Sequence, residues 1–233
     1  MKRFVLFLMV ALLSIGLVCA TFAANPPLYA KGNVLVGANF NDGPGSSDMT
    51  LIIQLSGGGT IYVNEGYPVK YITDPDNKGI TGWTKPSFDD KAWKDGVSGV
   101  GFADSDDNTT TATGLMSIWT RYRFDASNAT SVAELTLLAD YDDGYIVWLN
   151  GVEIARSAAV TTKGLKVGDE PAWDLSSAGL ANRGSAELAA GKPNAARWSN
   201  AAIEKTVLKV DFTSAVSPMA KLTATWGSIK AIR

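Results

Sequence analysis

Histidine is absent from the 233-residue sequence. Histidine is the commonest general base in enzymes, the usual partner of a serine or cysteine nucleophile, and the commonest zinc ligand. Its absence excludes every histidine-dependent catalytic triad and most zinc sites. We therefore expect that the chain is not an enzyme.

Cysteine is also scarce, and the only one, Cys19, lies in an N-terminal segment that we expect to be removed. The segment begins with the basic residues Lys2 and Arg3, continues with an uncharged, mostly apolar run over 4–18, and ends in small residues near Ala23. This pattern is typical of a secretory signal peptide. A bilayer span needs about 20 apolar residues, so a retained membrane anchor is the less favoured alternative. We expect residues 1–23 to be a signal peptide, no membrane span to remain after cleavage, and the protein to be secreted or displayed at the cell surface.

Cys19 itself has two interpretations. It would be the acylated first residue of a lipoprotein if cleavage occurred just before it, but the preceding Val18 is bulkier than lipoprotein processing usually accepts. We favour a small apolar residue within the signal peptide. The mature chain then has no cysteine, so disulfide bonds do not stabilise it outside the cell.

Positive charge is too sparse for a nucleic-acid-binding protein. The net charge of the whole chain is −2, and removal of Lys2 and Arg3 makes it more negative. Because nucleic-acid binding depends on neutralising phosphates with Lys and Arg, we expect no nucleic-acid partner. The remaining residues fit one domain, 24–216, followed by a basic tail, 217–233, which is either a frayed terminus or a sorting or attachment signal.

Short apolar or alternating runs separated by Gly, Asp, Asn and Pro predict an all-β fold, an antiparallel β-sandwich. Asn150-Gly151 marks a hairpin, because both central residues of a type I′ turn need positive φ. Residues 57–59, all Gly, mark a second turn, and residues 157–200 form a long irregular insertion before the last strand. The expected strands are Thr50–Leu55, Thr60–Val63, Val69–Thr73, Ser117–Phe124, Ala133–Ala139, Tyr145–Leu149, Val152–Arg156 and Thr206–Phe212.

The strand over 117–124 has two chemically different faces. Its period of two places Ile118, Thr120, Tyr122 and Phe124 on the face expected to meet the core. Trp119, Arg121 and Arg123 then point to solvent or a groove. Two interpretations stay open for that face. Indole and guanidinium groups could bind a sugar, or the Arg stems could simply pack over Trp119 in an ordinary sheet.

The sequence contains three motifs in order: Trp83 with Phe88-Asp89-Asp90-x-x-Trp93, then Trp119-x-Arg121-x-Arg123-Phe124, then Asp142-Asp143-Gly144 with Leu149-Asn150-Gly151. Together they resemble the galactose-binding-like jelly-roll modules of secreted bacterial proteins, over residues 60–157. The resemblance implies a jelly-roll sandwich that acts as a non-catalytic carbohydrate-binding or surface-adhesion module. The third motif is also similar to the protective-antigen-type sugar-binding domain. The last expected strand departs from the jelly-roll pattern, because it lacks a Gly-x-Asn turn and a terminal His.

The first motif also has a structural interpretation. Aspartates at the start of a turn accept hydrogen bonds from free backbone N–H groups, so we expect Asp89 and Asp90 to cap this turn. Phe88 and Trp93 are expected to anchor the turn to the core. For contacts with a carbohydrate or cell-surface glycan, the candidates are Trp119, Arg121, Arg123 and Trp148.

Two loops concentrate carboxylates, one at 104–108 and one at 140–144. Crowded carboxylates repel one another unless they are solvated or bridged by a cation, and Ca²⁺ prefers six to eight oxygen ligands. The first loop begins like an EF-hand but lacks the Gly and Glu that such a loop needs, at Thr109 and Leu115. The resemblance implies calcium in such loops, and a solvated acidic turn is the alternative. The expected calcium ligands are Asp104, Asp106, Asp140, Asp142 and Asp143.

Two further functions remain as alternatives to the binding module. One is a structural or assembly protein of the cell surface that has no sugar ligand and associates through a Trp-bearing face or an exposed sheet edge. The other is a glycoside-acting enzyme that uses two aspartates, although nothing in the sequence marks one of them as an acid with a raised pKa.

Overall fold

The structure is a computed structural model that describes residues 25–43, 45, 47–73, 79–103, 107–161, 165–175 and 196–213. The expected signal peptide and the basic tail lie outside these residues. Two of the expected calcium ligands, Asp104 and Asp106, do so as well. No helix within the described ranges is long and apolar enough to cross a membrane.

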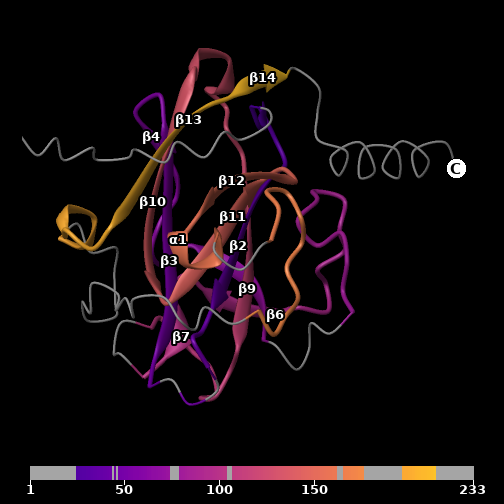
Figure 1. Ribbon diagram of the computed structural model, residues 1–233. Helices are drawn as coiled ribbons and strands as arrows, with labels where there is room; N and C mark the ends of the chain where they lie inside the picture. Colours follow the sequence, from indigo (N-terminus) through magenta and orange to yellow (C-terminus); the bar gives the residue numbers. More distant parts are fainter. Residues whose placement is uncertain are drawn as a thin grey trace, which may run out of the picture.

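Two six-stranded sheets pack face to face (Figure 1). The first, here the β3 sheet, has the order β13 (Glu204–Lys209), β10 (Glu134–Asp142), β3 (Met49–Gly57), β7 (Val100–Phe102) and β8 (Thr109–Thr110), with β4 (Thr60–Val63) also paired to β3. The second, the β2 sheet, has the order β12 (Val152–Arg156), β11 (Gly144–Leu149), β2 (Asn33–Phe40), β9 (Ser117–Phe124), β5 (Pro68–Thr73) and β6 (Lys94–Val97).

Most neighbouring strands in the two sheets are antiparallel, and β7 and β8 form a parallel pair. A separate parallel pair joins β1 (Pro27–Tyr29) to β14 (Asp211–Thr213). The helical elements in the described ranges are short: α1 (Ala158–Thr161), η2 (Ala129–Ser131) and η3 (Arg197–Ser199). The prediction of an all-β sandwich is therefore confirmed, and the arrangement is consistent with a jelly roll.

The space between the sheets holds the main hydrophobic core. Alternate residues of each strand point into it, which is the expected result of the pleat. The predicted inward face of β9 is confirmed, because Ile118, Tyr122 and Phe124 lie in this core and Thr120 is buried beside it. Other members are Leu35, Leu51, Ile53, Leu55, Leu135, Leu137, Tyr145, Val147 and Leu149.

The hairpin at Asn150-Gly151 is confirmed as well. These two residues have φ values of 53° and 87°, which a type I′ turn requires. The side chain of Asn150 adds a second role, because its Oδ1 accepts a hydrogen bond from the backbone N–H of Val34 at 2.8 Å. Its Nδ2 donates to the carbonyl of Pro27 at 2.7 Å, so the turn also fixes the start of β2.

Strand β2 was not predicted, although it occupies a central position in its sheet. All eight of its residues are buried, so its sequence shows no alternation of apolar and polar residues. It also contains Gly37, a residue that usually weakens a strand. Here a Cβ atom would lie 2.9 Å from side-chain atoms of Leu51, Ile53 and Thr120, so Gly37 allows the sheets to approach.

Most of the outer face of the β2 sheet is covered, which corrects the expectation that Trp119 and Arg121 point to solvent or a groove. Residues 79–93 and 165–175 cover it and form a third layer, magenta and orange at the right of Figure 1. Beneath them lies a second hydrophobic cluster. Its members include Val34, Val36, Ala38, Phe40, Ile72, Trp83, Trp93, Trp119, Ile146 and Trp148.

Polar contacts fasten this third layer to the sheet and to itself. Glu170 accepts hydrogen bonds from the backbone N–H of Gly82 at 2.7 Å and from Thr84 Oγ1 at 2.9 Å. Arg156, in β12, donates to the carbonyl oxygens of Leu165 at 2.6 Å and Lys166 at 3.0 Å. The layer is therefore an integral part of the domain.

Candidate functional site

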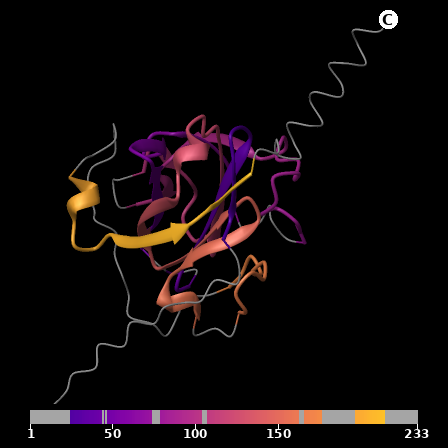
Figure 2. The same cartoon turned by 90° about the horizontal axis from the view of Figure 1, so that it is seen from above.

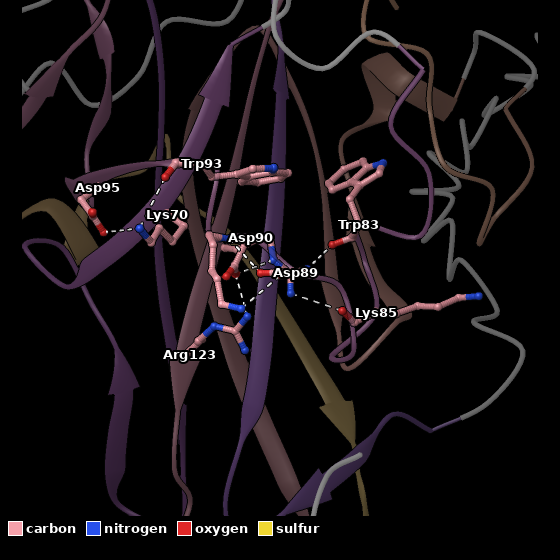
Figure 3. A network of polar contacts seen from close by, with 10 residues as sticks. Lys70, Trp83, Lys85, Asp89, Asp90, Trp93, Asp95 and Arg123 are labelled. Atoms are coloured by element: carbon pink, nitrogen blue, oxygen red, sulfur yellow. Dashed lines mark hydrogen bonds and ion pairs between the residues drawn. The ribbon is translucent and has the colours of Figure 1, made fainter. Parts of the chain in front are cut away.

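Arg121 holds the third layer in place. Its side chain is fully buried, and its Nε donates to Asp90 Oδ2 at 3.0 Å. Its two terminal nitrogens donate to the carbonyl oxygens of Trp83 and Lys85. The dashed lines in Figure 3 trace these contacts around Asp90. Arg121 thus satisfies backbone groups of the covering segment that would otherwise be buried without partners.

Aromatic rings complete the environment of Arg121. Its Cζ lies 5.2 Å from the centroid of the Phe88 ring and 5.9 Å from that of Trp93, within the range of cation–π contacts. The expected anchoring roles of Phe88 and Trp93 are therefore confirmed, with Arg121 as one of the groups that they contact.

Three of the four predicted sugar contacts are wrong as direct contacts. Trp119 and Arg121 are each 1% exposed, and Trp148 is fully buried. Trp83 stacks on Trp119, with ring centroids 3.9 Å apart, and meets the edge of Trp148 at 5.1 Å. The physical reason is the covering layer, which occupies the space that a sugar would need. These residues pack the second hydrophobic cluster.

The two aspartates of the first motif have different roles. Asp89 caps the turn as predicted, because its Oδ1 accepts the backbone N–H of Lys91 at 3.1 Å. Asp90 does not cap it, and its Oδ2 instead binds both Arg121 and Arg123, the latter at 2.8 Å. Burial alone would raise the pKa of Asp90, but hydrogen bonds and positive charge from Arg123 and Arg121 outweigh it and lower the pKa.

Arg123 is the one predicted sugar contact that reaches the surface. Its side chain is 36% exposed while it binds Asp90. It lines a pocket of about 400 Å³ together with Lys70 and Asp95, which form an ion pair at 2.7 Å. Lys70 also donates to the carbonyl of Trp93 at 3.4 Å. This pocket, the Arg123 pocket, is the first of two candidate sites.

The second candidate is the acidic end of the sandwich, where β10 turns into β11. Asp142 and Asp143 are only 3% and 6% exposed. Asp143 Oδ2 accepts the backbone N–H of Asp42 at 2.8 Å. Burial, a hydrogen bond to Asp143 and the negative charges of Asp143 and Asp48 raise the pKa of Asp142 to about 9. Asp142 therefore retains its proton at neutral pH.

Oxygen atoms without a hydrogen-bond partner surround this acidic end. One oxygen of each carboxylate, Asp142 Oδ1 and Asp143 Oδ1, has none. The same is true of Thr50 Oγ1, and Thr50 stands directly opposite Asp142 in the β3–β10 ladder, so that both side chains project from one face. Asn39 Oδ1 also lacks a partner, although its Nδ2 donates to the carbonyl oxygens of Asp142 and Gly144 at 2.8 and 3.1 Å.

Asp107, in the acidic loop at 104–108, lies next to the same row of the sheet. Gly101 pairs with Thr50 on the side opposite Asp142. A Cβ atom at Gly101 would lie 2.2 Å from Asp107 Oδ1, so the Asp107 side chain occupies the space over this glycine. The two predicted acidic loops thus approach the same end of the β3 sheet, as far as the described residues show.

Asp140 does not belong to the acidic end, which corrects its predicted role. It is fully buried and pairs with Arg197, whose Nε also binds Glu65 at 3.2 Å. A carboxylate that already neutralises a buried guanidinium is a poor calcium ligand, because the cation would have to displace it. Asp48, Thr50 and Asn39 were missed instead, since each is far from the Asp142-Asp143 motif in sequence and only sheet pairing and loop packing bring them near.

In the described ranges, no three acidic or Cys side chains form a ready-made metal site. Side-chain hydrogen bonds connect Asp142 to Asp143 and to Asp48. The donor set nevertheless fits a hard cation, because it consists of carboxylate, hydroxyl and amide oxygens, four of them without a hydrogen-bond partner. A proton and a cation would compete for this site.

Comparisons with models of known families, with curated proteins and with solved structures yield no match. The function therefore has to be inferred from the chemistry of the two sites. The acidic end offers buried oxygen ligands, and the Arg123 pocket offers solvent-accessible cationic donors.

Proposed function

We propose that the chain is an exported, non-catalytic carbohydrate-binding or surface-adhesion module of jelly-roll form whose acidic end holds Ca²⁺. The observation that carries the proposal is the meeting of Asp142, Asp143 and Asp48 beside oxygen atoms without hydrogen-bond partners. Like charges that are buried together destabilise a fold unless a proton or a cation neutralises them. A protein outside the cell is exposed to calcium, which prefers oxygen ligands of this kind.

The residues that would hold the cation are Asp142, Asp143 and Asp48, with Thr50 Oγ1 and Asn39 Oδ1 as neutral oxygen donors. Bound there, calcium would neutralise the carboxylates and order the turn between β10 and β11. Because Ca²⁺ takes six to eight ligands, water molecules would complete its coordination. Asp104 and Asp106 lie outside the described residues and remain predicted calcium ligands.

Burial supports a binding role over a catalytic one. The acid and base of a glycoside hydrolase must both contact the substrate. Asp142 and Asp143 are almost completely covered, and Asp90 is engaged by two arginines. This burial supports a role in holding positive charge over a role in contacting a substrate.

A glycan array tests the proposal directly. The mature protein should bind a defined set of glycans in calcium, and a chelator should reduce or abolish that binding. Asp143→Asn should reproduce the effect of the chelator, because it removes a ligand charge and keeps the side-chain size. The matched control is Asp89→Asn, which changes an exposed aspartate in the turn at 88–93. Binding to no glycan in the presence of calcium would contradict the proposal.

A second candidate function, a structural or assembly protein of the cell surface, is supported by the edge of the β3 sheet. Strand β13 ends that sheet, and Figure 2 shows it on the outside of the molecule. Val207 in β13 is 53% exposed, and Phe212 in β14 is 39% exposed. An edge strand with exposed apolar side chains can pair with another chain. Light scattering that shows concentration-dependent oligomers, unaffected by sugars and reduced by Val207→Lys, would favour this function.

A further inference from the structure

The Arg123 pocket lies on the outer face of the β2 sheet, at the edge formed by β5 and β6. The sheet register explains why charge gathers there. Lys70 stands opposite Arg121 on one side and opposite Asp95 on the other, and cross-strand partners project from the same face. Arg123 follows Arg121 by two residues, so it also projects from that face. Three cationic side chains thus meet along one short stretch of sheet.

Asp90 fixes the arginines of this group. One of its oxygens, Oδ2, accepts hydrogen bonds from Arg121 and Arg123 at 3.0 and 2.8 Å, and its side chain is only 8% exposed. The hydroxyl of Tyr67 also donates a hydrogen bond to the backbone carbonyl of Arg123 at 2.9 Å. The guanidinium of Arg123 is therefore held in position before any ligand binds, which reduces the entropy that binding would cost.

The pocket also keeps its cationic groups within reach of solvent. The side chain of Arg123 is 36% exposed and that of Lys70 is 28% exposed. The partner of Lys70, Asp95, is 87% exposed, and ion pairs of that kind contribute little to stability. An incoming anion can therefore displace Asp95 from Lys70 at small cost.

We propose that the Arg123 pocket binds the carboxylate of an acidic sugar, such as a uronic acid residue in a polysaccharide. The planar guanidinium of Arg123 matches a carboxylate, and Lys70 adds a second positive charge. The volume of about 400 Å³ lies within the range of small-ligand sites and accommodates a single sugar residue. The sugar part of this inference rests on the proposed function, whereas the carboxylate part rests on the pocket alone.

The test is calorimetric titration of the mature protein with oligomers of galacturonic acid and with the corresponding neutral galactose oligomers, in the presence of a chelator. The uronic acid oligomer should bind at least about tenfold more tightly than the neutral one, and added salt should weaken it. Arg123→Gln should reduce that affinity at least about tenfold. Lys91→Gln is the matched control, because Lys91 is exposed on the neighbouring turn and lies outside the pocket, and it should leave the affinity unchanged.

A second variant guards against a folding defect in Arg123→Gln. Lys70→Gln removes a partly exposed charge from the same pocket and should also weaken binding of the acidic oligomer. Equal affinities for the acidic and neutral oligomers, or full affinity in both pocket variants, would overturn the inference. If succinate bound as tightly as the uronic acid oligomer, the pocket would recognise a carboxylate alone, and the inference of a sugar ligand would be overturned.

The chelator separates this result from the proposed function. Calcium-dependent binding of a neutral glycan that Arg123→Gln leaves unchanged would preserve the proposed function and overturn the pocket. Binding of the acidic oligomer in chelator, lost in Arg123→Gln, would preserve the pocket even if the calcium proposal failed.

Discussion

Two buried aspartates in this domain are placed in opposite electrostatic surroundings. Asp90 faces two guanidinium groups, and its pKa is lowered. Asp142 faces the carboxylates of Asp143 and Asp48, and its pKa is raised to about 9. Both residues lie in Asp-Asp pairs, so neighbours in space and not in sequence set their charge. The Asp90 site is neutralised by the chain itself, whereas we propose that a proton or an external cation neutralises the acidic end.

The largest expected effect comes from removing the carboxylate of Asp90. Asp90→Ala leaves the fully buried Arg121 without its counter-charge, and breaking a buried ion pair in this way costs about 3–5 kcal/mol. The loss should appear as a lower free energy of unfolding in denaturant titrations. The control is Asp95→Ala, whose exposed pair with Lys70 should contribute less than about 1 kcal/mol. Equal losses in the two variants would contradict the role given to Asp90.

A smaller effect is expected in the pH dependence of the free energy of unfolding. The folded-state pKa of Asp90 lies below its usual value of 3.8, so its charge stabilises the folded state above that value. This contribution is lost as the pH falls through the lower, folded-state pKa. The difference in unfolding free energy between the wild type and Asp90→Asn should therefore be largest near neutral pH and shrink in acid. A difference in unfolding free energy that grew in acid would contradict a lowered folded-state pKa of Asp90.

Thr50→Val tests whether the neutral oxygen Thr50 Oγ1 is a calcium ligand at the acidic end. In chelator the variant should be more stable by about 1 kcal/mol, because a buried hydroxyl without a partner is replaced by a methyl group. In calcium it should bind the cation more weakly, because an oxygen donor is lost. Thermal unfolding with and without calcium measures both changes. A variant less stable in chelator, with unchanged calcium affinity, would show that Thr50 Oγ1 has neither role.

The smallest expected effect is that of Arg123→Gln on stability. Arg121 continues to hold Asp90, and Arg123 is partly exposed, so the loss should be about 1 kcal/mol or less. Denaturant unfolding of this variant beside Asp90→Ala measures the contrast. A loss as large as that of Asp90→Ala would mean that Arg123 is chiefly a structural residue.

Local signals in the sequence were sufficient for much of the fold. The dipeptide Asn150-Gly151 predicted a hairpin, because only a few residue types adopt positive φ at both central positions of the turn. The alternation of side chains over 117–124 predicted which face of β9 meets the core. Strand β2 was not predicted, because burial of both its faces removes the alternation of apolar and polar residues. The packing role of Gly37 is visible only once the opposite sheet is in place.

The candidate site was predictable only in part. Alternation separates the two faces of β9 but does not tell whether a distant segment covers one of them, so Trp119 and Arg121 were assigned to a sugar. The Asp142-Asp143 pair was visible in the sequence, whereas Thr50 reaches it through strand pairing and Asp48 through a loop. Contacts of this kind depend on the complete fold.

The most direct test of the account is a calcium titration of the chelator-treated protein and of Asp143→Asn, followed by thermal unfolding. A cation site at the acidic end predicts stoichiometric calcium binding to the wild type. At a concentration 100 times the dissociation constant, calcium should stabilise the wild type by about 2.7 kcal/mol, and this gain should be lost in Asp143→Asn. A wild-type protein that binds no calcium and unfolds at the same temperature with and without it would contradict the claim that an external cation completes the acidic end.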